Sequence, residues 1–178
     1  MYGVPGEMGA AVLHSVDELL ATLVIGVRTQ CAARGWTRPQ LVGIHRGGAW
    51  VAQRLHTALG LTAPLGTLDI SFHRDDFARS GLQPEVRSSS IPFVVDDAQI
   101  VLVDDILYTG RTIRAALNEL FDYGRPAGVL LAVLADRGGR ELPIAADAIG
   151  IRLELVPGQV VKLRGPDPLA LELQASGP

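Results

Sequence analysis

Apolar residues fall into short runs separated by longer segments with helical spacing, which predicts alternating strands and helices. The runs rich in aliphatic and β-branched residues predict strands at 40–44, 63–72, 100–103 and 127–135. The segments with helical periodicity lie at 19–34, 49–59 and 111–123. Because strands and helices alternate, we expect an α/β fold with a mostly parallel central sheet flanked by helices.

Local signals place the boundaries of the domain. Ser15 and Glu18 form a capping-box pattern before the first helix, and Gly35 follows the end of that helix. Residues 1–14 are interpreted as a loose lead-in, and 15–178 as a single domain. The tail contains three short strand-like runs, at 147–151, 160–164 and 169–173.

Residues 73–92 interrupt this rhythm. The segment is polar and contains Gly81, Pro84, Pro92 and three consecutive serines. So long a stretch without periodicity is typical of a lid, an extended hairpin or a disordered loop. The sequence leaves these three interpretations open.

The strand predicted at 100–103 runs directly into Asp104 and Asp105 within "IVLVDDILYTGRT". Acidic residues near a helix start are common, which explains one aspartate better than two. Two adjacent carboxylates suit a ligand with several hydroxyls, such as ribose, or help to hold Mg²⁺ through water. Ligands in open α/β sheets bind beyond the carboxyl ends of strands, where these acids lie.

The segment "TGRT" that follows has the character of a phosphate site. Gly110 permits a tight turn and a close approach to a ligand, while Thr109 and Thr112 offer hydroxyls. We expect the amides at the start of the next helix to be unpaired and to bind an anion. Plain N-capping explains one threonine, but not acids, glycine and both threonines together. The combination predicts a ribose phosphate ligand; neither Walker A nor G-x-G-x-x-G occurs.

Composition bears on the class and the cellular location of the protein more than on the chemistry of its candidate site. Among 178 residues, 48% are hydrophobic and 20% charged, which supports a sizeable core. The net charge of -3 does not indicate a nucleic-acid binder, although a local basic face is compatible with it. Cys31 is the single cysteine, and no apolar run is long enough to span a membrane. With no signal-peptide pattern at the start, we expect a cytoplasmic protein.

The motif strand resembles the phosphoribosyl-pyrophosphate (PRPP) signature of type I phosphoribosyltransferases. The flanks "LDISFHRDD", "VDDILYTGRTIRAALNELFDYGRP" and "LAVLADRGGRELPI" resemble the PyrR family, pyrimidine operon regulators that are also uracil phosphoribosyltransferases. The resemblance covers about residues 15–173. It implies a Rossmann-like fold with a small hood and a flexible loop at 73–92. The hood would include 136–144 and the C-terminal strands.

The resemblance also implies roles for particular residues. Asp104 and Asp105 would be catalytic. Ribose and 5′-phosphate contacts would come from Asp104, Asp105, Ile106, Leu107, Tyr108, Thr109, Gly110, Arg111 and Thr112. The pyrophosphate loop would be His45, Arg46, Gly47 and Gly48, with its backbone amides on the leaving group. The flexible loop would contribute Arg74 and Asp75, and the base hood Arg137, Gly138 and Val160.

Two positions depart from the family pattern. Arg46 stands where threonine is expected, so it would either add charge to the pyrophosphate grip or obstruct it. Gly139 stands where the hood usually has histidine, so base recognition there would rely on backbone groups. Because base choice lies in the hood, a purine-base phosphoribosyltransferase remains the alternative.

The expected reaction joins uracil to PRPP, giving UMP and pyrophosphate, with Mg²⁺ bound to PRPP rather than to the protein. The resemblance further implies a UMP-sensing regulator that binds leader mRNA of pyrimidine genes, unless this chain is an enzyme alone. Arg28, Arg34, Arg38 and Arg152 are spread along the sequence rather than clustered. We expect a homodimer or a higher homo-oligomer and no membrane partner.

Overall fold

A five-stranded parallel sheet forms the centre of the molecule. The computed structural model describes residues 11–12, 15–71 and 88–175. The order in the sheet is β3-β2-β4-β5-β6, and every neighbouring pair is parallel. These strands are β2 (Pro39–Ile44), β3 (Gly66–Leu68), β4 (Gln99–Leu107), β5 (Gly128–Asp136) and β6 (Ala148–Arg152). The predicted α/β fold is confirmed.

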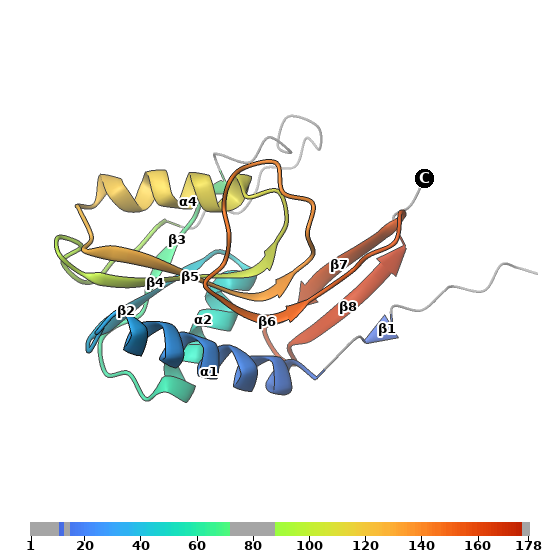
Figure 1. Ribbon diagram of the computed structural model, residues 1–178, viewed down its shortest axis with the longest axis horizontal. Coiled ribbons are helices and arrows are strands. Elements are labelled where there is room, and N and C mark those ends of the chain that lie inside the picture. Colours follow the sequence, from blue (N-terminus) through green and yellow to red (C-terminus); the bar gives the residue numbers. More distant parts are fainter. Residues whose placement is uncertain (1–10, 13–14, 72–87, 176–178) are drawn as a thin grey trace, which may run out of the picture.

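Helices cover both faces of this sheet (Figure 1). Helices α1 (Val16–Ala33) and α2 (Gly47–Leu59) lie on one face, and α4 (Arg111–Asp122) lies on the other. Side chains of β4 alternate between the two layers: Val101 belongs to the core beneath α1 and α2, and Leu102 to the core beneath α4. Burial on both sides explains why the sheet strands are almost continuously apolar.

The first helix begins and ends where the sequence predicts, but its predicted cap is wrong. Helix α1 starts directly after Ser15, whose side chain makes no capping hydrogen bond, so no capping box with Glu18 forms. At the other end Gly35 takes a positive φ of 65° and donates its N–H to the Ala32 carbonyl. Cys31 is buried in this helix; burial raises the pKa of its thiol, although Arg34 opposes the shift.

Strand β4 is longer than predicted, and β3 is shorter. Pairing between β4 and β5 continues to Leu107 and Asp136, so both aspartates of the motif lie inside a strand instead of after it. Strand β3 covers three residues of the predicted 63–72. Beyond it the Asp69 amide donates to the Ser89 hydroxyl, which replaces a ladder hydrogen bond.

A second, antiparallel sheet lies on the side where β4 and β5 end (Figure 1). It consists of β1 (Ala11–Val12), β8 (Ala170–Ala175) and β7 (Gln159–Arg164), in that order. Strands β7 and β8 are two of the predicted tail strands, whereas β1 falls inside the expected lead-in. Val161 and Leu171 are buried in the core shared with α1 and α2. No helix in the described ranges is long and apolar enough to cross a membrane.

Candidate active site

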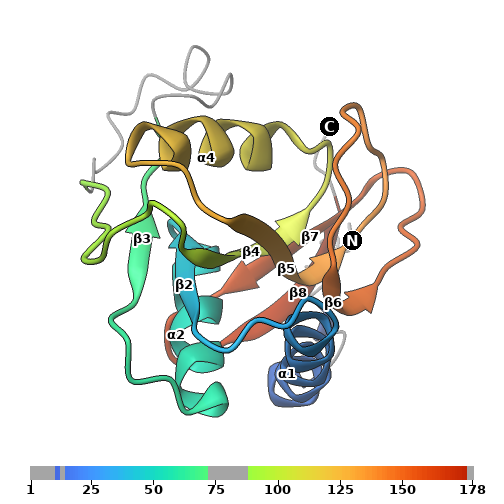
Figure 2. The ribbon, with the colours of Figure 1, turned by 60° about the vertical axis from the view of Figure 1, so that its left-hand side comes forward.

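The connections of the sheet place a crevice between β2 and β4. Helix α2 follows β2 onto one face, whereas α4 follows β4 onto the opposite face (Figure 2). The two connecting loops therefore diverge at the carboxyl edge, which is where open α/β sheets bind ligands. Gly43 and Val103 pair across the two strands just before the loops begin. The two motif segments predicted from sequence thus meet at one place.

The loop at 45–48 approaches β4 closely, and an added Cβ at Gly47 or Gly48 would force a neighbouring atom to move. A Cβ on Gly47 would lie 2.0 Å from Oδ2 of Asp105. A Cβ on Gly48 would lie 2.6 Å from the Val103 carbonyl oxygen and 2.9 Å from the Asp104 Cα. These contacts bring the start of α2, with its outward amides, against the paired carboxylates.

One amide of this loop already has a partner within the chain. The His45 N–H donates to the Leu68 carbonyl at 2.8 Å, and its contact with pyrophosphate stays a prediction. The peptide between His45 and Arg46 is cis. Arg46 lies exposed at the N-cap of α2, where the main chain of Gly47 and Gly48 continues the loop into the helix.

The two aspartates differ in their surroundings. Asp104 is buried, with 3% of its surface exposed, whereas Asp105 is half-buried beside Gly47. Oδ1 of Asp104 accepts the amide of Asp105, and Oδ1 of Asp105 accepts the amide of Ile106. Asp105 therefore keeps Oδ2 turned toward the other loop, which makes it the better placed of the two to meet a ligand.

The loop at 108–110 leads from β4 into α4. Gly110 is buried, has a φ of 95°, and packs against Leu142 and Ile144. The Thr109 hydroxyl accepts the Arg111 amide at 3.3 Å, so this amide, predicted to be unpaired, has a partner. The loop shape expected for an anion site is present, with one fewer free amide.

A segment after β5, residues 137–147, lies against this loop; we call it the hood segment. The Leu107 carbonyl accepts the Arg137 amide at 3.1 Å. The Thr109 carbonyl accepts the amides of Glu141 at 3.0 Å and Leu142 at 3.1 Å. Main-chain hydrogen bonds therefore join two segments that are about 30 residues apart in sequence.

A phosphoribosyl transferase domain model matches residues 15–163. The chain belongs to the phosphoribosyl transferase family. It is 52% identical over 166 residues to the bifunctional protein PyrR of Nitrosococcus oceani, covering 92% of this chain and 94% of that protein. It is 57% identical to the bifunctional protein PyrR of Pseudomonas paraeruginosa, covering 93% and 98%. The resemblance to the PyrR family is confirmed.

Solved structures with the same fold are more distant in sequence. A hypoxanthine-guanine phosphoribosyltransferase from Bacillus anthracis aligns with a TM-score of 0.65 at 14% identity, covering 85% of this chain and 86% of that one. The hypoxanthine phosphoribosyl transferase of Trypanosoma cruzi aligns with a TM-score of 0.65 at 17% identity, covering 95% and 94%. At this identity the likeness establishes the phosphoribosyl transferase fold and nothing about the base.

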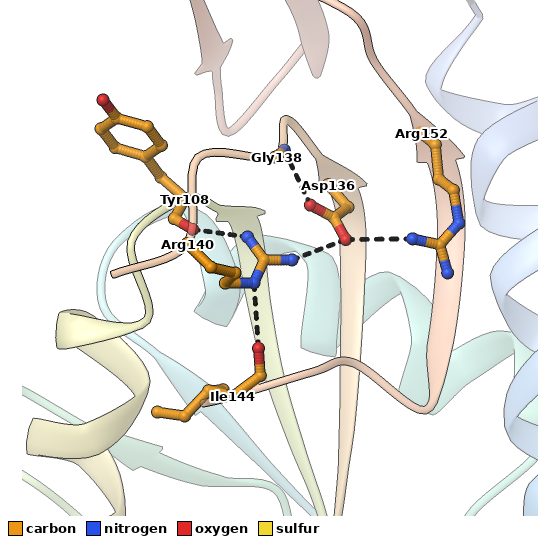
Figure 3. Close-up of polar contacts among 6 residues, drawn as sticks. All are labelled: Tyr108, Asp136, Gly138, Arg140, Ile144 and Arg152. Atoms are coloured by element: carbon orange, nitrogen blue, oxygen red, sulfur yellow. Dashed lines mark hydrogen bonds and ion pairs between the residues drawn. The ribbon is translucent and has the colours of Figure 1, made fainter. Parts of the chain in front are cut away.

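Arg140 is the polar centre of the hood segment in this phosphoribosyl transferase (Figure 3). Its guanidinium donates to the Tyr108 carbonyl, to the Ile144 carbonyl at 2.9 Å and to Oδ2 of Asp136 at 2.6 Å. Asp136 also accepts the Gly138 amide at 3.0 Å and pairs with Arg152 at 3.3 Å. Burial raises the pKa of Asp136, but Arg140, the Gly138 amide and Arg152 outweigh burial and hold its pKa below the ordinary value.

Arg137 and the aromatic ring of Tyr108 form a second contact between the same segments. The Arg137 guanidinium carbon lies 4.0 Å from the ring centroid, within cation–π range. A Cβ on Gly139 would lie 2.5 Å from Cε2 of Tyr108, and Gly139 has a φ of 74°. At Gly139 the tyrosine ring and the positive φ together leave little room for a side chain.

The remaining predicted residues are placed unequally. Val160 lies in β7, which contacts β4, and it is half-buried. Arg74 and Asp75 lie outside the described residues, as does most of the predicted loop at 73–92. Its end is described: Ser90 pairs with Thr67, and the Ser89 hydroxyl contacts Glu119 of α4.

Sequence reasoning placed Asp136 and Arg140 within the expected hood at 136–144 but did not name either of them as a site residue. The only local signal was their spacing in "DRGGR", an acidic and a basic residue four positions apart. Two positive-φ glycines, Gly138 and Gly139, turn the chain between them so that the side chains pair. The third partner, the Tyr108 carbonyl, is 32 positions from Arg140 and left no trace in the sequence pattern.

Proposed function

We propose that this phosphoribosyl transferase joins uracil to PRPP and releases pyrophosphate, giving UMP. The observation that carries the proposal is the approach of Gly47 to Asp105 at the crevice between β2 and β4. It sets a glycine loop, a carboxylate pair and a second anion loop around one space. High identity to proteins named bifunctional protein PyrR supports uracil as the base.

In this proposal each loop holds one part of PRPP. Asp104 and Asp105 hold the ribose hydroxyls, residues 108–112 hold the 5′-phosphate, and residues 45–48 hold the pyrophosphate. Mg²⁺ enters as part of the substrate, on the diphosphate of PRPP. The adjacent carboxylates suit a hydrated ion held through the ligand.

The reaction exchanges one bond at the anomeric carbon for another. Uracil N1 forms a bond to C1 and gives up its proton, while the bond from C1 to the pyrophosphate oxygen breaks. The transition state resembles an oxocarbenium ion, as in other glycosyl transfers. Asp105 lies closest to this region and stabilises developing positive charge or takes the proton; the loops supply orientation and electrostatic stabilisation.

The test is a base panel with PRPP and Mg²⁺: uracil, hypoxanthine, guanine and orotate, followed by pyrophosphate release. We expect turnover with uracil and background release with the other three. Hypoxanthine or guanine turnover without uracil turnover would replace the proposed base with a purine. The purine enzymes with the same fold are 12–18% identical to this chain, and they support the fold alone.

We also propose a regulatory role, in which UMP promotes binding to leader mRNA of pyrimidine genes, because the relatives carry the name bifunctional. Of the dispersed arginines, Arg34 pairs with Asp147 and Arg152 with Asp136, so neither offers a free charge within one chain. A basic RNA face would then require a homodimer or larger assembly, in the cytoplasm where transcripts form. A leader-RNA titration at two salt concentrations tests this role, because phosphate contacts make affinity salt-dependent; RNA binding indifferent to UMP would refute it.

A further inference from the structure

Three consecutive carbonyl groups face the hood segment. They belong to the last residue of β4 and to the loop at 108–112, which we call the phosphate loop. The Leu107 carbonyl accepts the Arg137 amide, the Tyr108 carbonyl accepts the Arg140 guanidinium, and the Thr109 carbonyl accepts two hood amides. A loop that binds an anion must turn its carbonyl oxygens away from that anion, because both carry negative charge. The hood segment is where those oxygens are bound.

Arg140 is the one donor in this set that acts through its side chain. The other donors are main-chain amides of Arg137, Glu141 and Leu142, which only a substitution to proline would remove. Its guanidinium uses three nitrogens on three different partners, and 24% of the side chain is exposed. A planar guanidinium with several fixed donors can bind three partners in this way, whereas a lysine ammonium lacks that geometry.

We infer that Arg140 is a positioning residue: it fixes the Tyr108 carbonyl so that the 108–112 loop presents its amides to the 5′-phosphate. The inference rests on the proposed function and assigns it a residue outside the two substrate loops. Asp136 acts one step further back, because its carboxylate holds the guanidinium at 2.6 Å.

The role of Arg140 is geometric rather than electrostatic. Its charge is balanced by Asp136, whose side chain is 6% exposed and therefore screened little by solvent. Arg152 also approaches Asp136, at 3.3 Å, but it is 75% exposed and contacts no phosphate-loop atom among the described contacts. Arg140→Lys keeps the positive charge but loses the planar guanidinium, so this variant should fail to hold the Tyr108 carbonyl in place.

The experiment compares Arg140→Lys and Arg140→Gln with the control Arg54→Gln. Arg54 lies in α2 and forms an exposed ion pair with Asp167, with 47% and 89% of the two side chains exposed. Exposed pairs contribute little, so the control should keep wild-type kinetics. Loss of a hydrogen bond from a charged donor corresponds to about tenfold or more in affinity. We expect both Arg140 variants to raise the KM for PRPP about tenfold while the KM for uracil stays within about twofold.

Binding measurements separate positioning from a general loss of structure. Calorimetry with UMP and with uridine should show weaker UMP binding by the Arg140 variants and unchanged uridine binding, because uridine lacks the phosphate. If Arg140→Gln fails to fold, Arg140→Lys and Asp136→Asn provide the same comparison. An unchanged PRPP affinity in folded Arg140→Lys, or equal losses for UMP and uridine, would overturn the inference. Absence of uracil turnover in the wild type would instead refute the proposed base, since PRPP affinity still tests Arg140.

Discussion

Two loops meet at the carboxyl edge of the sheet, and different forces hold them. The loop at 45–48 is fixed by steric fit: Gly47 and Gly48 press against the carboxylate of Asp105 and the main chain of β4. The loop at 108–110 is fixed by hydrogen bonds from the hood segment, including those of Arg140. The loop at 45–48 depends on two residues without side chains, whereas the loop at 108–110 depends on the side chain of Arg140.

This difference means that the two sides of the crevice tolerate different substitutions. A steric contact fails when an atom is added, because a close-packed interior has no spare volume. A hydrogen-bonded contact fails when a donor is removed, and its strength varies with pH when a carboxylate takes part. Substitutions on each side should therefore damage the site in different ways.

A large effect is expected on the steric side of the crevice, from Gly47→Ala. The new Cβ would lie 2.0 Å from Oδ2 of Asp105, so this carboxylate must turn away from the crevice. Misplacement by about 1 Å can cost about 100-fold in rate, and we expect that loss in kcat/KM. Alanine is the better helix former, so the free energy of unfolding should change by less than about 1 kcal/mol.

Gly60→Ala provides the matched control at the other end of helix α2. Gly60 has a φ of 67° with no atom within 4 Å of an added Cβ. This variant should lose about 1 kcal/mol of stability from backbone strain and keep wild-type turnover. Equal turnover by Gly47→Ala and Gly60→Ala would remove the steric account of the first loop.

A smaller effect, on stability, is expected on the hydrogen-bonded side. The pKa of Asp136 is held below its ordinary value, so its carboxylate stabilises the fold above about pH 4, the ordinary range for aspartate. That contribution is lost as pH falls through the lowered pKa, because the folded carboxyl must then take up a proton. Asp136→Asn should therefore cost about 1–3 kcal/mol at neutral pH and clearly less once the pH has fallen below the lowered pKa.

Denaturant unfolding of wild type and Asp136→Asn at several pH values measures this difference. Arg152→Gln is the control, because it removes only the exposed partner of Asp136. A stability gap between wild type and Asp136→Asn that is the same at neutral and acidic pH would contradict the assignment.

Sequence reasoning named the candidate site residues whose chemistry is local. The adjacent carboxylates at 104–105 and the turn at 109–112 stand together in one motif, and apolar periodicity located the main strands. The length of β4 was not predictable from the aspartates, because β5 continues the pairing beside them. Asp105 interrupts the apolar pattern without interrupting the strand.

Contacts between distant segments account for the rest. The approach of Gly47 to Asp105 and the bond from Arg140 to the Tyr108 carbonyl exist only after the sheet has assembled. Strand β1 contains two residues and depends on β8 for its pairing, so no local pattern announced it. In the folded chain Ser15 makes no capping hydrogen bond, and the His45 amide donates to the Leu68 carbonyl.

We propose that the crevice between β2 and β4 transfers a ribose phosphate to uracil, with Asp105 at its centre. The direct measurement is uracil-dependent pyrophosphate release by wild type, Asp105→Asn and Asp122→Asn, the last being an exposed aspartate at the end of α4. We expect release by wild type and Asp122→Asn, and a loss of about 100-fold or more in Asp105→Asn at unchanged folding. Equal release by all three proteins would place the reaction elsewhere.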